Sequence, residues 1–357
     1  MTDTMDSIFD IAPYSMARAE KVAFLQSSMS ELTQFHYDRC SEYKAMIDAL
    51  FGGCDFTTSL DELPYLPVGV FKHHRLKSIP DDEVFKYMRS SGTSGQRPSE
   101  IVLDKKTANL QTKGLTKTLN GVLGGQRLPM LVVDSEDALG ANANFSARGA
   151  AIRGFSMFGR RPVFALDHDL KPDLLRIKSF FDQHKDKAVF VFGFTFLIWT
   201  SLCEALAELD IQIDMSNAIL LHGGGWKKLV NKAVSPAAFK ERLKQQFNIS
   251  RIHDYYGMVE QTGSIYVECD AGHLHCSVFN DVLIKDVISL ENKNFGEEGL
   301  IQTLSIFPYS YPGHSILTED LGMLLGEDDC PCGRKGKYFR VLGRLAEAEI
   351  RGCSDTL

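Results

Sequence analysis

A loop of ten residues, numbers 90–99, constrains this chain more than any other part of its sequence. It reads SSGTSGQRPS, with five hydroxyl side chains and two glycines. Glycines let a backbone approach a phosphate group and turn its N–H groups toward it, and hydroxyls add neutral hydrogen-bond donors. Because strand-like segments flank the loop at 84–88 and 100–103, we expect a strand–loop–strand unit that binds phosphate, with Arg97 as an added cation.

The loop is not the P-loop of kinases and GTPases, which leads into a helix and requires a Gly-Lys-Ser/Thr sequence that is absent here. A flexible surface turn is the alternative interpretation of its glycine and serine content. The order of its hydroxyls and glycines favours phosphate binding.

Hydrophobic periodicity predicts an α/β fold around this loop. Residues 15–50 have the spacing of two helices, which end at Gly52 and Gly53. From residue 84, strands alternate with helices, which is typical of a mostly parallel sheet. The expected strands are 130–134, 162–166, 188–194, 218–221 and 251–255, and the expected helices are 173–184, 196–207 and 236–247. After residue 264, strand patterns at 264–269, 274–279, 281–288 and 299–305 indicate antiparallel structure.

Composition excludes several classes of protein. A formal net charge of −7 and the lack of a long basic run argue against nucleic acid as a partner. The first residues show no basic segment followed by an apolar one, so no secretory signal is predicted. The most apolar stretch, residues 188–199, is shorter than the roughly 20 residues that cross a bilayer. We therefore expect a soluble cytoplasmic protein with no integral membrane association.

Five motifs in order resemble those of the adenylate-forming enzymes, which include acyl-CoA synthetases and luciferases. After the Ser-Gly-Thr-Ser-Gly-x-x-Pro loop come three glycines at 223–225, a Tyr-Tyr-Gly-x-x-Glu segment at 255–260, Thr-Glu-Asp at 318–320 and Gly-Arg at 343–344. Glu319 stands where the superfamily has a glycine. The resemblance implies the α/β large-domain fold of acyl-CoA synthetases, with mixed sheets and a smaller β-rich part, lacking the usual C-terminal domain that bears a catalytic lysine.

The same resemblance implies ATP and Mg²⁺ as cofactors and assigns residues to them. Glu260 would help to place Mg²⁺, which prefers hard oxygen ligands, and Arg344 would reach ribose or phosphate. From the sequence alone, Glu260 is equally a helix cap and Asp320 a turn residue. The implied nucleotide-binding residues are Ser91, Gly92, Thr93, Ser94 and Gly95 for phosphate, Gly223, Gly224, Gly225, Tyr255, Tyr256 and Gly257 around adenine, and Asp320 and Arg344 around ribose.

A closer resemblance, over nearly the whole chain, is to the LuxE-type acyl-protein synthetases. The matching segments are PYS at 13–15, LTQFHY at 32–37, FGFTF at 192–196 and GGWK at 224–227. This resemblance implies a fatty acid substrate, its activation as acyl-AMP, and transfer of the acyl group to an enzyme cysteine. An acyl-accepting partner that resembles an acyl-CoA reductase is also implied.

On this resemblance we divide the chain into four parts. They are an N-terminal helical segment at 1–75, an α/β adenylation core at 76–263, a β-rich subdomain at 264–344 that completes the nucleotide site, and a C-terminal tail at 345–357. The aromatic residues of 192–199 are candidates for an acyl tunnel, and ordinary core packing is the alternative.

Cys353 is the candidate acyl-accepting cysteine, because the LuxE family places that residue near the C-terminus. Its thiolate would attack acyl-AMP and form a thioester, and the neighbouring Arg351 would favour the thiolate. Together with Glu260 and Arg344, it forms the predicted catalytic set. A terminal thiol without function is the alternative.

Cysteine and histidine in the last third of the chain indicate a metal site. Cys269, His275, Cys330 and Cys332 offer the ligands of tetrahedral Zn²⁺, with Cys276 or His273 as substitutes. The CPCGR segment at 330–334 also resembles phenylacetate-CoA ligase-like enzymes, some of which carry a structural zinc. A set of reduced, partly buried thiols is the alternative.

Two other functions stay open at this stage. One is a ligase that delivers an acyl or aryl group to coenzyme A or to a carrier protein. The other is a non-catalytic subunit that binds acyl-adenylate.

Overall fold

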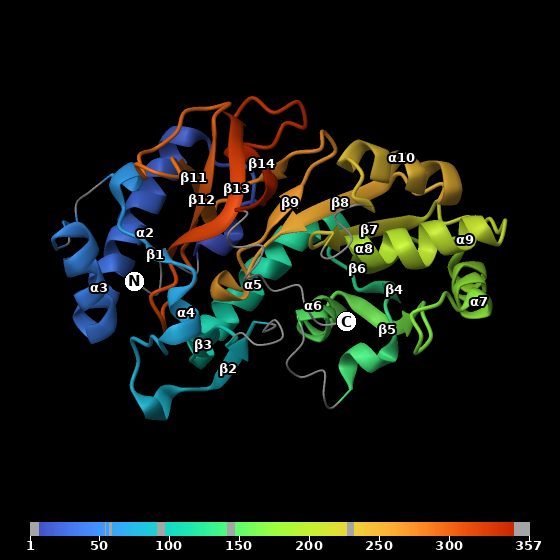
Figure 1. Ribbon diagram of the computed structural model, residues 1–357, viewed down its shortest axis with the longest axis horizontal. Coiled ribbons are helices and arrows are strands. Elements are labelled where there is room, and N and C mark those ends of the chain that lie inside the picture. Colours follow the sequence, from blue (N-terminus) through green and yellow to red (C-terminus); the bar gives the residue numbers. More distant parts are fainter. Residues whose placement is uncertain are drawn as a thin grey trace. The chain divides into compact units, whose positions relative to one another are not determined.

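The computed structural model describes residues 7–53, 55–56, 59–90, 97–140, 147–226 and 232–345 (Figure 1). Contacts between Cα atoms divide the chain into two compact units. Of the described residues, those up to 118 and those from 257 onward form unit 1, and those between 119 and 256 form unit 2. Each unit is described by itself.

Unit 2 is a parallel sheet with helices on both faces. Its strands lie in the order β5-β4-β6-β7-β8, and every neighbouring pair is parallel. The bounds are β4 Leu128–Val133, β5 Gly159–Phe164, β6 Val189–Phe194, β7 Ala218–Gly223 and β8 Arg251–Tyr256. All five strands were predicted within a few residues, because buried parallel strands are continuous apolar runs.

Helices cover the sheet of unit 2. They are α6 Ala147–Ser156, α7 Leu174–His184, α8 Thr195–Leu197, a π-helical segment Ile198–Glu204, α9 Ala205–Glu208 and α10 Pro236–Phe247. Side chains of β6 alternate between two environments, since Val191 joins the cluster with α7 and α10 while Phe192 contacts Phe155 of α6. The prediction of α10 is confirmed at its start. Ser235 caps the helix, because its hydroxyl accepts a 3.2 Å hydrogen bond from Ala238 N, and Pro236 follows as the first helical residue.

Unit 1 contains the antiparallel structure that was predicted after residue 264. Its strands lie in the order β11-β12-β13-β14-β10-β9, and β1 pairs in parallel with β13. A separate two-stranded antiparallel ribbon is formed by β2 and β3. The bounds are β1 Leu66–Pro67, β2 Lys86–Arg89, β3 Glu100–Leu103, β9 Tyr266–Glu268, β10 Leu274–His275, β11 Asn280–Lys285, β12 Glu298–Ser305, β13 Ser315–Glu327 and β14 Lys337–Arg344.

The helices of unit 1 include the predicted N-terminal pair, α2 (Arg18–Arg39) and α3 (Ser41–Phe51). As predicted, α3 ends at a glycine, since Gly52 takes the left-handed conformation with φ of 72°. The unit also holds α4 (Val70–His73) and the part of α5 (Lys105–Leu123) that precedes residue 119. Short 3₁₀ turns in the two units are Ile8–Asp10, Leu60–Glu62, Asp81–Glu83, Glu136–Leu139 and Val259–Gln261.

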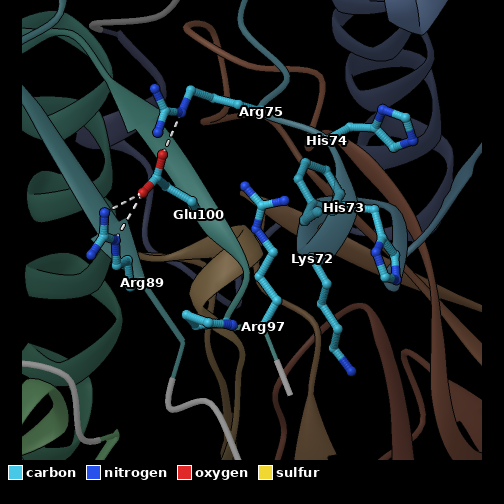
Figure 2. Close-up of a pocket in the computed structure, with 9 residues that line it drawn as sticks. Lys72, His73, His74, Arg75, Arg89, Arg97 and Glu100 are labelled. Carbon is cyan, nitrogen blue, oxygen red and sulfur yellow. Dashed lines mark hydrogen bonds and ion pairs between the residues drawn. The ribbon is translucent and has the colours of Figure 1, made fainter. Parts of the chain in front are cut away.

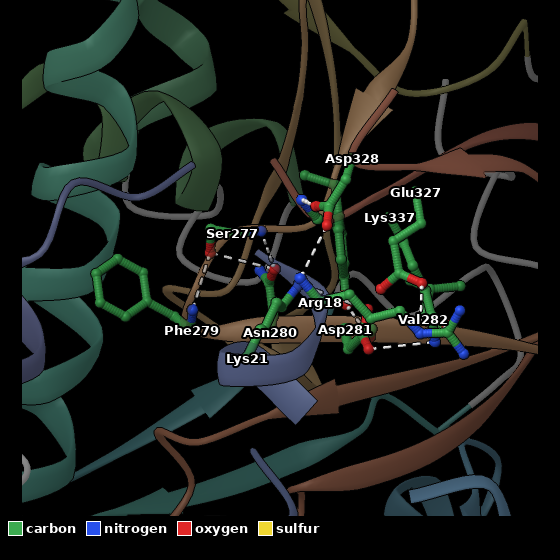
Figure 3. A network of polar contacts seen from close by, with 12 residues as sticks. Arg18, Lys21, Ser277, Phe279, Asn280, Asp281, Val282, Glu327, Asp328 and Lys337 are labelled. Carbon is green, nitrogen blue, oxygen red and sulfur yellow. Dashed lines mark hydrogen bonds and ion pairs between the residues drawn. The ribbon is translucent and has the colours of Figure 1, made fainter. Parts of the chain in front are cut away.

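Within the described ranges, no helix is both long enough and apolar enough to cross a membrane. Unit 1 contains a buried ionic network between α2 and the sheet, in which Lys21 Nζ lies 3.5 Å from Asp281 Oδ1 on β11 (Figure 3).

Candidate functional site

The two ends of the serine-rich loop are joined in unit 1. Ser90 N donates to Ser99 O at 3.0 Å, and Ser99 N donates to the Ser90 hydroxyl at 2.8 Å. The loop therefore connects β2 to β3, as predicted, with Arg89 opposite Glu100 in the strand register. The predicted phosphate contacts Ser91, Gly92, Thr93, Ser94 and Gly95 lie outside the described residues.

Glu260 lies in a buried 3₁₀ turn of unit 1 and is 6% exposed. Burial raises the pKa of its carboxyl group above the ordinary value, although the charge of Lys72 lowers it in part. A hydrogen bond from Tyr311 OH to Glu260 O, 2.8 Å long, fixes the backbone of this turn. Among the described helices and turns, the Glu260 side chain caps none, and a hydrogen bond from the Ser99 side chain reaches its carboxyl group. A carboxylate is a hard oxygen ligand of the kind that Mg²⁺ prefers.

The structure brings Asp320 and Arg344 together. They are direct partners in the β13–β14 register, and Arg344 Nε donates to Asp320 Oδ1 at 3.2 Å. Asp320 N also donates a hydrogen bond to the hydroxyl oxygen of Thr318 at 3.1 Å. The Thr-Glu-Asp motif is thus extended β-strand rather than the turn considered from the sequence, and Glu319 fits this backbone without a glycine.

Unit 2 carries the glycine and tyrosine motifs at the carboxyl ends of two adjacent strands. Gly223 ends β7, and a Cβ there would lie 2.5 Å from the ring of Tyr255 on β8. Gly224 has φ of +78°, a conformation that side-chain-bearing residues rarely adopt. Tyr256 ends β8, and Gly225 has open space where a Cβ would stand. Ligands of parallel sheets bind at this edge, which fits an adenine site.

His222 is a buried residue of the same edge. Its Nδ1 lies 3.0 Å from the Thr195 hydroxyl, and burial lowers the pKa of the imidazole to about 3. The ring is therefore neutral at physiological pH. Of the aromatic residues considered for an acyl tunnel, Phe196 and Trp199 pack on the core cluster of unit 2, as the alternative interpretation has it.

The four predicted metal ligands come together in unit 1. The Sγ atoms of Cys269, Cys330 and Cys332 and a ring nitrogen of His275 all lie within 4.8 Å of one another. Cys269 Sγ is 3.9 Å from Cys330 Sγ, and His275 Nε2 is 3.4 Å from Cys332 Sγ. Three thiols and one imidazole are a set that suits tetrahedral Zn²⁺. Of the two possible substitutes, His273 lies 3.3 Å from Cys330 Sγ, whereas Cys276 is buried beside Asp281.

Comparison with known proteins decides the family. The family model described as "Acyl-protein synthetase, LuxE" matches residues 1–357. The chain belongs to this family. A long-chain-fatty-acid–luciferin-component ligase of Aliivibrio fischeri is 23% identical over 98% of this chain and 92% of its own length. The ligase of the same name from Vibrio harveyi is 22% identical over 99% and 92%.

Solved structures confirm the fold of this LuxE family member. An open conformation of 2-hydroxyisobutyryl-CoA ligase, in complex with 2-HIB-AMP and CoA, superposes with a TM-score of 0.70. It is 16% identical, and the match covers 94% of this chain and 77% of that one. The α/β fold predicted from the five motifs, that of the adenylate-forming ligases, is therefore confirmed.

Cys353, the predicted acyl acceptor, lies outside the described residues. Sequence reasoning did not single out Lys72 of α4, whose charge lowers the pKa of the Glu260 carboxyl group in part. No motif marks this lysine, because a lone cation in the short helix α4 has no sequence signal.

Proposed function

We propose that this protein activates a fatty acid with ATP as acyl-AMP and then transfers the acyl group to Cys353. The whole-length match to the acyl-protein synthetase family carries the proposal. Unit 1 supports it with a buried carboxylate at Glu260, the Asp320–Arg344 pair and the closed base of the serine-rich loop.

In the first step, a carboxylate oxygen of the fatty acid attacks the α-phosphorus of ATP. The bond from that phosphorus to the oxygen bridging to the β-phosphate breaks, and pyrophosphate leaves with the electron pair. Glu260 would hold Mg²⁺, which neutralises phosphate charge when bound. Asp320 would accept hydrogen bonds from the ribose hydroxyls, while the ion pair with Arg344 fixes its orientation.

In the second step, the thiolate of Cys353 attacks the acyl carbonyl carbon. The bond to the AMP oxygen breaks, AMP leaves, and a thioester remains on the protein. An acyl-accepting protein, an acyl-CoA reductase-like partner, would then remove the acyl group. The luciferin-component ligases to which this chain is similar motivate the choice of a long-chain acid.

Pyrophosphate release tests the first step. With ATP, Mg²⁺ and a panel of straight-chain fatty acids, we expect release of pyrophosphate only when an acid is present. The same reactions with coenzyme A should give no faster turnover, since the acceptor is a protein thiol. Release that needs coenzyme A would favour the coenzyme A ligase, and no release with any acid would favour a non-catalytic subunit.

We also propose that Cys269, His275, Cys330 and Cys332 bind Zn²⁺ with a structural role. The site ties the β9–β10 hairpin to the connection between β13 and β14, so the metal would cross-link segments about 60 residues apart in sequence. The burial of the four ligand side chains leaves little room for a substrate, since of the four only Cys332 is partly exposed.

Metal analysis of the purified protein should find about one zinc per chain. Cys330→Ser should remove it and lower the thermal midpoint, because metal-binding energy contributes to folding energy. Cys203→Ser is the matched control, a buried cysteine of unit 2 far from the cluster in sequence, and should retain the zinc. Full zinc content in Cys330→Ser would refute this site.

A further inference from the structure

The connection between β11 and β12, residues 286–297, exposes apolar side chains that the core of unit 1 does not use. Ile288 is 93% exposed, and three other large apolar residues of this connection are also exposed, namely Val287, Leu290 and Phe295. Exposed apolar residues that gather in one place on a soluble protein mark a contact surface. Residues 286–297 are called the apolar loop below.

Hydrogen bonds fix the backbone of the apolar loop. Asp286 Oδ1 accepts from the backbone N–H groups of Ile288 and of the next residue, at 2.9 Å each. Asn292 Nδ2 donates to Asp61 O at 2.8 Å, which ties the loop to the segment before β1. Leu290 has φ of 60°, a left-handed conformation that asparagine or glycine adopts at lower cost than leucine. Neither burial nor local conformation therefore explains why these residues are apolar.

Carboxylates accompany the apolar side chains of this loop. Its one lysine, Lys293, is compensated, because its Nζ lies 3.0 Å from Asp286 Oδ2. Glu291 and Glu297 add two negative charges, and exposed Glu298 follows at the start of β12. The loop is therefore both apolar and acidic. This combination disfavours anionic lipid surfaces and nucleic acid, and it favours a protein surface that is apolar and cationic.

Unit 1 itself carries such a surface on the β2–β3 ribbon. Phe85, whose N–H donates to Leu103 O at 2.8 Å, extends β2 by one residue and is 54% exposed. Tyr87 follows two positions later on the same face and is also exposed, and Arg75 Cζ lies 5.1 Å from the centre of its ring. Among the described strands, β2 pairs only with β3, so its outer edge is open to another chain.

The exposed aromatic residues of the ribbon are bordered by arginines. Arg75 and Arg89 share one carboxylate, that of Glu100. Its Oε2 lies 2.7 Å from Arg89 Nη2, and its Oε1 forms an ion pair with Arg75. Figure 2 shows both arginines beside this carboxylate. Because one negative charge serves two positive ones, the ribbon keeps a net positive charge at this place.

We propose that the apolar loop of one copy of this chain docks on the β2–β3 ribbon of a second copy. Apolar and aromatic side chains would form the centre of the contact, and carboxylates would face arginines at its rim, as in other protein interfaces. Loop against loop, or ribbon against ribbon, would bring like charges together and is disfavoured. The contact therefore joins two different surfaces, and copies associate head to tail.

Sedimentation velocity of the full chain over a series of concentrations tests this. We expect the average mass of wild type to rise with concentration. Ile288→Asp and Phe85→Asp should each weaken association at least about tenfold, because each places a charge at the apolar centre of the contact. Both side chains are exposed in the single chain, so both variants should fold, which circular dichroism verifies.

An equimolar mixture of the two variants identifies which surfaces meet. Ile288→Asp retains an intact ribbon, and Phe85→Asp retains an intact loop. The mixture should therefore form a dimer with one chain of each variant, and nothing larger. Leu175→Asp is the matched control, because it places the same charge on an exposed residue of α7 in unit 2, and it should associate as wild type does.

Three results would overturn the proposal. They are a wild type that stays monomeric at every concentration, undiminished association in either variant, and a mixture of the variants that remains monomeric. Phosphatidylcholine vesicles test the other occupant of an apolar loop. If wild type stays monomeric and sediments with these vesicles while Ile288→Asp does not, the loop contacts a membrane and the proposal fails.

Discussion

Cys353→Ser should abolish stable acyl labelling of this protein. Incubation of wild type with ATP, Mg²⁺ and a radiolabelled fatty acid is expected to give a label that neutral hydroxylamine removes, as it removes thioesters. The variant should lose that label by about a hundredfold or more, because removal of a covalent nucleophile eliminates the acyl-enzyme. The first step does not use the thiol, so one turnover of acid-dependent pyrophosphate release should survive.

Ser354→Ala is the control for the neighbouring position, and its labelling should equal that of wild type. A hydroxylamine-sensitive label that persists in Cys353→Ser would show that another residue accepts the acyl group. Mass spectrometry of the peptide that contains residue 353 then identifies the attachment point directly, through the mass of the added acyl group.

The strands and helices that the sequence predicted well are those whose own residues decide them. β6 reads VFVFGF and is buried at every position, so its apolar run alone marks it. The helix α10 carries a serine cap and a proline at its start, and both signals are local. Such elements can be predicted from their own residues, without the tertiary contacts of the rest of the molecule.

Elements that were missed depend on tertiary packing. The long helix α5 contains Gly114, which lowers helix propensity. A Cβ at this glycine would stand 2.1 Å from the ring of Phe307, so the residue is there for close packing with a segment about 190 positions away. Similarly, β13 was not predicted beyond its motif, because polar Glu319 and Asp320 interrupt its apolar run.

The candidate site shows the same division. The five motifs located Glu260, Asp320 and Arg344, yet only the β13–β14 register reveals that the last two form a pair. Cysteine and histidine content predicted the four metal ligands, and strand pairing explains how they meet, since β10 lies between β9 and β14.

Asp281→Asn should be the most destabilising single change in the buried network of unit 1. Asp281 forms ion pairs with two lysines of this network (Figure 3). Its Oδ2 lies 3.2 Å from Lys337 Nζ, and its Oδ1 lies 3.5 Å from Lys21 Nζ. Asp281 and Lys21 are each 2% exposed. Loss of this carboxylate removes the ion-pair partner that the buried Lys21 shares with the largely buried Lys337, and breaking such a buried pair costs about 3–5 kcal/mol.

Urea unfolding followed by far-UV circular dichroism measures this loss. Both tryptophans, Trp199 and Trp226, lie in unit 2, so their fluorescence reports on that unit while circular dichroism reports on the whole chain. Glu204→Gln is the control, because it breaks an ion pair with Lys232 that is largely exposed and contributes at most about 1 kcal/mol. A circular dichroism transition of Asp281→Asn that matches the control would contradict the prediction.

The pH dependence of the stability difference between wild type and Asp281→Asn identifies the cause of that difference. Burial by itself would raise the pKa of the Asp281 carboxyl group, but the charges of Lys21 and Lys337 outweigh it, and the pKa lies below its ordinary value. A carboxyl group with a lowered pKa in the folded state stabilises the fold above its unfolded pKa of about 3.9, and this contribution is lost as the pH falls through the folded value. Wild type should therefore exceed Asp281→Asn in stability at pH 7 and approach it on acidification below about pH 4. A difference that stays constant down to that pH would indicate lost packing rather than lost charge.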